Sequence, residues 1–389
     1  MKGHIRRRGE RSWAIILDLD RGPDGKRRQK WHTVQGTKKE AERKLTEILH
    51  SLATGSYIEP SETTVGEYLL RWLADYAKIN VGAKTYERYD GIVRNDLIPA
   101  LGSIPLLKLQ PLQIQAYYTA ALQSGRKDGK GGLSAQTVLH HHRLLRKALA
   151  QAMRWNLLAA NVADRVEAPH PRPKEMQPLD EAESADLIHA AEGTRLYVSI
   201  LLAVTTGLRR GEILALTWSD VDLPGRRLFV RHALEETRNG VNVKEPKSRR
   251  GRRTVTLPAF VVDSLKVHKA EQELRKRALG AAYDDRGLVC CGEDGTIWSP
   301  SAFTSAYRAL LARRKMKGIP FHALRHSHAS QLLRDGVSPK IISERLGHSK
   351  VGFTLDVYSH LLPGMQEEAA SHVESGIGEA LKRRPKRSA

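Results

Sequence analysis

The sequence predicts a multidomain protein in which a small β-sheet-plus-helix unit, an all-α unit and a mixed α+β, mainly helical unit follow one another. Its 389 residues suffice for two or three domains. Apolar residues occur in short strand-like runs before residue 36 and at helical spacing after it. The proline-rich stretch APHPRPKEMQPL (168–179) separates two regions of different composition and indicates an extended linker.

The composition favours a polyanionic partner. Lysine and arginine outnumber aspartate and glutamate by 64 to 43, for a formal net charge of +21 at pH 7. This excess favours nucleic acid over a membrane surface. No run approaches the roughly 18 apolar residues of a membrane span, and the apolar run at 13–17 is too short for a signal peptide. The two cysteines are adjacent and lack disulfide or metal-ligand spacing. We therefore expect a cytoplasmic, nucleoid-associated protein.

Residues 1–58 are expected to form the first unit. The apolar run SWAIILDLD, the Asp24-Gly25 turn signal and the partly alternating RRQKWHTV predict two strands, and HIRRR is a candidate third. Thr37 and Glu40 have capping-box spacing and predict the start of a helix. The basic sheet is either a reader of a DNA groove or a solvated face, and the sequence leaves both open.

Residues 62–168 are expected to be helical. Thr63 or Thr64 caps the first helix, VGEYLLRWLADYA, and RKDGKGG (126–132) is predicted to be a loop. Further helices are expected near 84–97, 111–123 and 134–155. The last of these places Val138, Leu145, Leu149 and Met153 near one face.

Three consecutive histidines, His140, His141 and His142, lie within this last predicted helix. A helix points neighbouring side chains about 100° apart, so the three rings cannot converge on one metal. We expect them to be solvated or to face phosphate.

After the linker at 169–179, residues 180–389 are expected to form the third unit. Helices are predicted near 180–192, 195–206 and 210–217, strands near 227–233 and 252–257, and helices from 259 onward. The segment KEPKSRRGRRTVTL (244–257) has the pattern of a basic β-hairpin from which Lys247 reaches a ligand or stays solvated.

The motif HALRH raises the question of a zinc site. His322 and His326 have the i, i+4 spacing of a metal pair, but Arg325 lies between them and the glutamate of H-E-x-x-H is missing. A cation beside the ligands opposes a divalent metal. The same residues suit an anion, since Arg325 offers a bidentate fork and His322 a donor on the same face.

Two other short motifs carry candidate residues. In TTGLRRGEILAL (205–216), Arg209 opens a helix and Glu212 lies three residues later on the same face, which alone indicates an ordinary structural ion pair. In LGHSKVGFTLDVYSH (346–360), His348 follows a helix-ending glycine, and Tyr358 has polar neighbours although tyrosines so placed usually pack in the core.

Taken in order, TGLRRGE, PKSRRGRRTV, HALRHSHAS and LGHSKVGFTLDVYSH resemble the successive catalytic boxes of the tyrosine recombinase, or phage integrase, family. The resemblance covers most of the chain. Residues 1–58 resemble the arm-type DNA-binding domain of phage-type integrases and 62–168 their helical core-binding (SAM-like) domain, with the catalytic domain at 180–389. By motif, the resemblance implies the catalytic residues Arg209, Lys247, His322, Arg325, His348 and the nucleophile Tyr358, supported by Glu212.

The resemblance implies a site-specific recombinase that cuts and rejoins DNA through a 3′-phosphotyrosyl intermediate, without metal, ATP or other cofactor. It implies double-stranded DNA as partner, at core and arm sites, a homotetramer on two DNA sites with exchanged C-terminal tails, and accessory directionality or DNA-bending factors. Two alternatives remain at this point: a type IB topoisomerase, which uses similar chemistry, and a non-catalytic DNA-binding regulator on the same scaffold.

Overall fold

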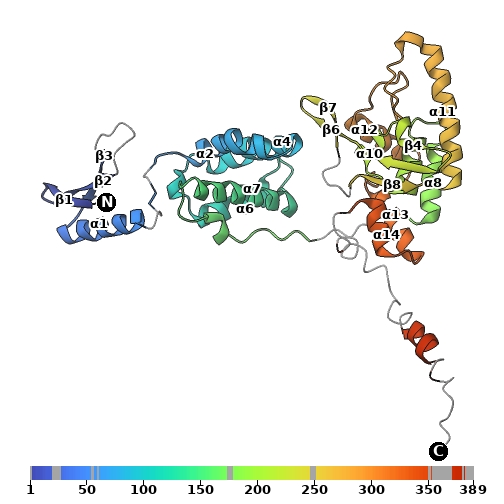
Figure 1. Cartoon of the computed structure of the whole chain (residues 1–389). Helices are drawn as coiled ribbons and strands as arrows, with labels where there is room; N and C mark the ends of the chain where they lie inside the picture. Colours follow the sequence, from blue (N-terminus) through green and yellow to red (C-terminus); the bar gives the residue numbers. More distant parts are fainter. Residues whose placement is uncertain are drawn as a thin grey trace, which may run out of the picture. The chain divides into compact units, whose positions relative to one another are not determined.

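A computed structural model describes residues 2–19, 28–53, 57–58, 61–172, 178–245, 251–348, 352, 370–378 and 381 (Figure 1). The chain divides into two compact units, Met1–Pro173 and Lys174–Ala389. The division falls within the predicted linker, whose described residues 169–172 and 178–179 are in neither helix nor strand. None of the helices among the described residues is long and apolar enough to cross a membrane.

The N-terminal residues form a three-stranded antiparallel sheet in the order β1-β2-β3, built from β1 (Lys2–Gly9), β2 (Ser12–Leu19) and β3 (Arg28–Gln35). The third strand predicted from HIRRR is confirmed. Helix α1 (Lys38–Ala53) packs on one face of the sheet, where Ile15, Leu17 and Ile48 form a small core. Thr37 and Glu40 make the expected capping box, with the Thr37 N–H donating to Glu40 at 2.6 Å. The Asp24-Gly25 turn lies outside the described residues.

The second stretch is helical, as predicted. Thr64 accepts a hydrogen bond from the Glu67 N–H and donates its own N–H to the Glu67 carboxylate, so the first helix has a complete capping box. Trp72 and Tyr68 are fully buried in the core of this stretch. The α- and π-helices are α2 (Val65–Trp72), η1 (Leu73–Ala77), α3 (Lys78–Asn80), α4 (Ala83–Ile92), η2 (Val93–Leu97), α5 (Ile98–Leu101), α6 (Pro111–Ser124) and α7 (Ala135–Arg154).

Two predictions for α7 were wrong. His141 and His142 are buried rather than solvated, because each ring nitrogen Nδ1 pairs with a tyrosine hydroxyl of α6, at 2.7 Å for Tyr117 and 3.0 Å for Tyr118. Met153 is 37% exposed, while the other residues of its predicted face are buried. Two histidines can lie at the α6–α7 contact, where apolar residues usually pack, because the tyrosine hydroxyls form hydrogen bonds with their ring nitrogens.

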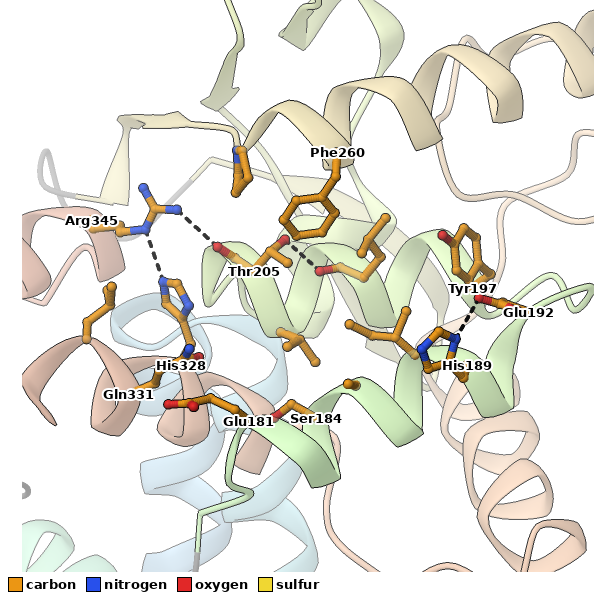
Figure 2. A pocket seen from close by; sticks show the side chains of 16 residues that line it. Glu181, Ser184, His189, Glu192, Tyr197, Thr205, Phe260, His328, Gln331 and Arg345 are labelled. Atoms are coloured by element: carbon orange, nitrogen blue, oxygen red, sulfur yellow. Dashed lines mark hydrogen bonds and ion pairs between the residues drawn. The ribbon is translucent and has the colours of Figure 1, made fainter. Parts of the chain in front are cut away.

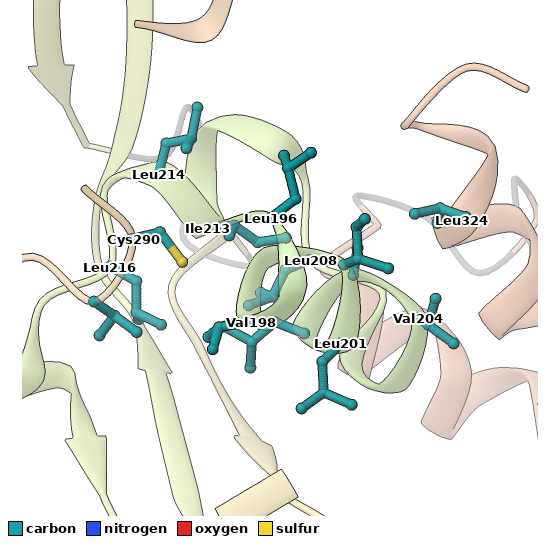
Figure 3. Close-up of a cluster of buried hydrophobic side chains, with 14 of the residues drawn as sticks. Leu196, Val198, Leu201, Val204, Leu208, Ile213, Leu214, Leu216, Cys290 and Leu324 are labelled. Carbon is teal, nitrogen blue, oxygen red and sulfur yellow. The ribbon is translucent and has the colours of Figure 1, made fainter. Parts of the chain in front are cut away.

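The C-terminal unit is built on the buried helix α9 (Tyr197–Thr206). Figure 3 shows Val198, Leu201 and Val204 of this helix within the core. Around it lie α8 (Glu181–Ala191), α10 (Arg210–Leu214), α11 (Ala259–Leu279), α12 (Pro300–Arg313), α13 (Ala323–Arg334) and α14 (Pro339–Leu346).

The strands of this unit form two small sheets. One has the order β4-β5-β8, from β4 (Val221–Asp222), β5 (Arg227–Val230) and β8 (Arg253–Thr256), and the other pairs β6 (Ala233–Thr237) with β7 (Gly240–Lys244). The predicted hairpin at 244–257 is therefore wrong for the described strands, because β7 pairs with β6 and β8 with β5. β8 pairs with β5, which lies more than 20 residues earlier in the chain. The alternation of polar and apolar residues in β8 predicts a strand but does not identify its partner.

Candidate DNA-cleavage site

Arg209 is placed by the junction between α9 and α10. Gly207 ends α9 in the left-handed region, at φ 65°, and Arg209 then takes an extended conformation as the N-cap residue of α10. Its backbone N–H donates to Glu212 Oε2 at 2.8 Å and its Nη1 donates to Oε1 at 2.8 Å. The Arg209 side chain is 41% exposed and that of Glu212 is 4% exposed. One edge of the guanidinium is thus anchored in the protein while the side chain remains accessible to a ligand.

Glu212 has a second cationic partner, Arg253 at the start of β8. Its Nη1 and Nη2 donate to the two Glu212 oxygens at 3.1 and 2.9 Å. Burial tends to raise the pKa of Glu212, but the hydrogen bond and charge of Arg253, followed by the charge of Arg209, outweigh it and hold the pKa below its ordinary value. Glu212 is therefore a buried carboxylate anion shared by two arginines.

Arg325 connects two turns that are distant in sequence. It lies in the first turns of α13 and is 3% exposed. Its Nη1 donates to the Gly207 carbonyl at 2.8 Å and its Nη2 to the Leu346 carbonyl at 2.6 Å. One guanidinium therefore holds the end of α9, which leads to Arg209, against the end of α14, which leads to His348.

Three histidines surround this junction. His322 is exposed at the N-terminus of α13, with its ring centroid 5.2 Å from that of His326 in an edge-to-face arrangement. His348 follows the left-handed Gly347 that ends α14, and its N–H donates to the Ser343 carbonyl at 3.0 Å.

The environment keeps these imidazoles neutral. The surrounding protein first, then the charges of Arg325 and Arg209, lower the pKa of His322. Burial, then the same two arginines, lowers the pKa of His348 to about 4. Burial, then His322 and Arg325, lowers the pKa of His326 to about 4. At neutral pH each ring therefore offers one N–H donor and one nitrogen acceptor.

The arrangement suits a phosphate rather than a cation. Among the residues that the structure describes, no group of three histidine, cysteine or acidic side chains is placed to hold a metal ion. Guanidinium groups and neutral imidazole N–H groups are donors that match phosphate oxygens.

Four of the six predicted catalytic residues thus lie around one junction, together with Glu212: Arg209, His322, Arg325 and His348. Lys247 and Tyr358 lie outside the described residues. Arg253 was not among the predicted site residues. A signal existed, because Arg253 shares the strand face of the buried Val255 and Leu257, and an arginine on an inward face requires a buried partner.

A second arginine that the sequence analysis missed, Arg345, connects this junction to a separate pocket of about 560 Å³ (Figure 2). Its Nε donates to His328 Nε2 at 3.0 Å, and its Nη2 donates to the Thr205 carbonyl at 3.0 Å. Figure 2 shows the Arg345–His328 pair at one end of the pocket and the His189–Glu192 pair at the other. The lining does not include Arg209, His322 or Arg325.

Comparisons with known proteins find two family models and several relatives that match this chain. A model of the phage integrase family matches residues 177–364, and a model of the phage integrase N-terminal SAM-like domain matches residues 64–122. An integrase of Streptomyces ambofaciens is 30% identical over 361 residues, covering 89% of this chain and 88% of that protein. A tyrosine recombinase XerC-like protein of Caldanaerobacter subterraneus is 28% identical over 380 residues, covering 93% of this chain and 95% of that protein.

The fold also matches a solved structure of the lambda integrase, determined as a tetramer bound to a Holliday junction. The TM-score is 0.55 at 17% identity, and the match covers 91% of this chain and 94% of that chain. At this identity the likeness concerns the fold. It extends over nearly the whole length of both proteins.

The buried His328 predicts acid sensitivity of the C-terminal unit. Burial, then the charge of Arg345, lowers the pKa of His328 to about 3, whereas an unfolded histidine has a pKa near 6.5. Between these values the unfolded chain binds a proton that the folded chain does not, so stability falls as the pH is lowered through this window. His328→Gln keeps a hydrogen-bond acceptor without titrating. Between pH 7 and 5 we expect it to lose about 2 kcal/mol less stability than wild type.

The measurement is chemical denaturation followed by circular dichroism at a series of pH values. His232→Gln, which changes an exposed histidine of the same unit, is the control and should follow wild type. Identical pH dependence of all three proteins would contradict the assignment.

Proposed function

The chain belongs to the phage integrase family and is a tyrosine-type site-specific DNA recombinase, and we propose that it cuts and rejoins DNA at the junction around Arg209 and Arg325. The observation that carries the proposal is the pair of hydrogen bonds from Arg325 to the Gly207 and Leu346 carbonyls. Arg209 follows the first carbonyl by two residues and His348 follows the second by two. A phosphodiester bound here would lie beside the accessible Arg209 guanidinium and the turn that carries His348.

The Arg209 guanidinium suits the transition state of phosphoryl transfer, and Arg325 holds the surrounding turns in place through the Gly207 and Leu346 carbonyls. Attack on a phosphodiester adds negative charge to the non-bridging oxygens, and preorganised donors aimed at these oxygens stabilise that charge. Arg209 offers an accessible guanidinium held on one side by Glu212. The ring of His348 is neutral and therefore carries one N–H group. Because guanidinium groups are permanently charged, we propose that this chemistry requires neither a metal nor ATP.

We propose Tyr358 as the nucleophile. A free tyrosine has a pKa near 10, so forming the anion at pH 7 costs about 4 kcal/mol unless a base accepts the proton. The lowered pKa of His322 keeps its imidazole neutral and able to accept that proton. The phenolic oxygen then forms a bond to phosphorus while the bond to the 5′-oxygen breaks. This yields a 3′-phosphotyrosyl link, and we propose that Lys247 protonates the departing 5′-oxygen.

Rejoining reverses these steps. The 5′-hydroxyl of a partner strand attacks the phosphotyrosyl bond, its proton goes to Lys247, and the tyrosine oxygen leaves with the proton held by His322. The energy of the broken phosphodiester is conserved in the protein link, which is why no external energy source enters the scheme.

The first prediction tests the nucleophile on a core duplex, meaning a DNA duplex enriched from a random library by binding to the full-length protein. On a core duplex nicked next to the cleavage position, wild type should accumulate a protein–DNA adduct that withstands denaturant. Tyr358→Phe removes only the attacking oxygen, so we expect no adduct and unchanged binding in a mobility-shift assay. Tyr283→Phe is the matched control. Adduct formation by Tyr358→Phe at the wild-type rate would overturn the assignment.

We also propose that residues 1–58 bind a second class of DNA site through the sheet face opposite α1. His4, Arg6 and Arg8 alternate along β1 with residues that face the helix, and Trp31 of β3 is 48% exposed with the Arg8 guanidinium 5.7 Å from its ring centroid. A β-ribbon of this kind fits the major groove of DNA, and arginines reach base edges and phosphates there. Residues 62–168 would then bind the core site.

The same selection from a random library should also enrich an arm duplex, meaning a duplex that wild type binds without forming the covalent adduct, and Arg6→Ala combined with Trp31→Ala should weaken binding of the full-length protein to it. One phosphate contact and one stacked or groove contact together account for about 2 to 4 kcal/mol, or a 30-fold to 1,000-fold loss. Binding to the core duplex should stay unchanged, measured by fluorescence anisotropy at fixed salt. Lys39→Ala, on α1, is the control. Equal losses on both DNA sites would contradict a separate arm-type function.

The C-terminal tail supports a proposal about assembly. Val373, Ile377 and Leu381 recur at helical spacing, and each is more than half exposed. We propose that this apolar face docks on a neighbouring protomer, within a homotetramer that holds two DNA sites.

Deleting residues 364–389 should therefore impair recombination between two sites more strongly than binding of one core duplex. The assay compares recombinant product with single-site affinity for the same preparation. A control deletion of 384–389 removes the basic end and keeps the apolar face. Recombination at the wild-type level after the longer deletion would refute the docking proposal.

A further inference from the structure

Arg253 is buried at the first position of β8 and makes no exposed contact surface of its own, since its side chain is 5% exposed. All three nitrogen atoms of its guanidinium group donate hydrogen bonds to acceptors within the protein. Nη1 and Nη2 donate to Glu212, and Nε donates to the Arg345 carbonyl at 2.6 Å. Resting on the function proposed above, we propose that Arg253 is a positioning residue for DNA cleavage, which orients Arg209 through Glu212 and the His348 turn through Arg345.

The first connection runs through the shared carboxylate. Glu212 Oε1 accepts from Arg209 Nη1 and Arg253 Nη1, and Oε2 accepts from the Arg209 N–H and Arg253 Nη2. The fork of Arg253 defines the plane of the carboxylate because it reaches both oxygens. The Arg209 guanidinium makes a single contact to this carboxylate, through Nη1. Its direction therefore depends on a carboxylate whose orientation Arg253 sets.

The second connection runs through the end of α14. The last carbonyls of a helix lack intrahelical partners, and cations are favourable there. Arg253 binds the carbonyl of Arg345, and Arg325 binds the next carbonyl, that of Leu346. Two buried arginines thus hold consecutive carbonyls immediately before Gly347 and His348. The charge of Arg253 also contributes to the lowered pKa of His348.

Arg253 is placed to position other groups rather than to bind phosphate itself. Its Nε, Nη1 and Nη2 all donate to acceptors inside the protein, so it can affect DNA only through the residues it holds. Lysine cannot replace it, because one ammonium cannot reach both carboxylate oxygens and the Arg345 carbonyl in a planar arrangement. Conservation of charge alone should therefore not restore function.

The experiment uses the full-length protein and the nicked core duplex defined above, with Arg253→Met and Arg253→Lys as variants. Arg252→Met is the matched control, because Arg252 is the preceding residue, is more than half exposed and pairs with Glu245. We expect both Arg253 variants to form adduct about 10-fold to 100-fold more slowly, since small displacements of a catalytic group cost rates of this order. Binding of the core duplex and the Arg252→Met rate should match wild type.

A second substrate distinguishes positioning from a general structural defect. A core duplex with a methylphosphonate at the cleaved position has one non-bridging oxygen replaced by methyl, so less negative charge develops and less depends on Arg209. We expect the loss caused by Arg253→Met, relative to wild type on the same substrate, to shrink to within about threefold. Equal losses on both substrates would mean that the residue only stabilises the fold and would overturn the proposal.

Two further variants cover the case in which Arg253→Met lowers the melting temperature. The adduct rates of Arg253→Lys and Glu212→Gln are then compared on the phosphodiester and methylphosphonate duplexes in the same way. Wild-type rates for the Arg253 variants would overturn the positioning role while leaving the proposed function intact, because wild type would still form the adduct through Tyr358.

Discussion

A single buried carboxylate, Glu212, makes it possible to concentrate several arginines in a small volume. Arg209 and Arg253 share the Glu212 carboxylate, Arg325 binds the Gly207 carbonyl two residues before Arg209, and like charges that lie close together repel strongly inside a protein. The Glu212 carboxylate pairs with two of these arginines and offsets one positive charge, while backbone carbonyls at a helix end accept hydrogen bonds from Arg253 and Arg325. The unbalanced positive charge that remains lies where the Arg209 guanidinium is accessible. Under the proposed function, this junction is therefore preorganised for a phosphate of DNA.

The histidines complete this arrangement without adding charge. His326 and His348 have pKa values of about 4, and the pKa of His322 is also lowered, because each imidazole lies near arginines and within protein surroundings. A phosphodiester would bring negative charge and favour imidazole protonation in the complex. In the proposed scheme the rings would accept a proton more readily once the anion is bound, which would couple proton transfer to the presence of substrate.

Much of the site was predictable because its residues come in short motifs whose order is itself informative. The helix boundaries at Thr37 and Thr64 were predictable because capping boxes are local. Three features depended on distant partners that local pattern does not identify: the burial of His141 and His142 against tyrosines of another helix, the pairing of β8 with β5, and the choice of Glu212 as the partner of Arg253. For the histidines and Arg253, a polar or charged side chain is buried because a distant segment supplies its partner.

The central claim is that this cationic junction holds a phosphate while a tyrosine near the end of the chain becomes joined to it. The most direct measurement is tandem mass spectrometry of the adduct trapped on the nicked core duplex after digestion of protein and DNA. We expect one modified peptide, in which the 3′-phosphate of a nucleotide is esterified to the Tyr358 oxygen. A nucleotide attached to a different residue, or to the 5′ side of the break, would contradict it.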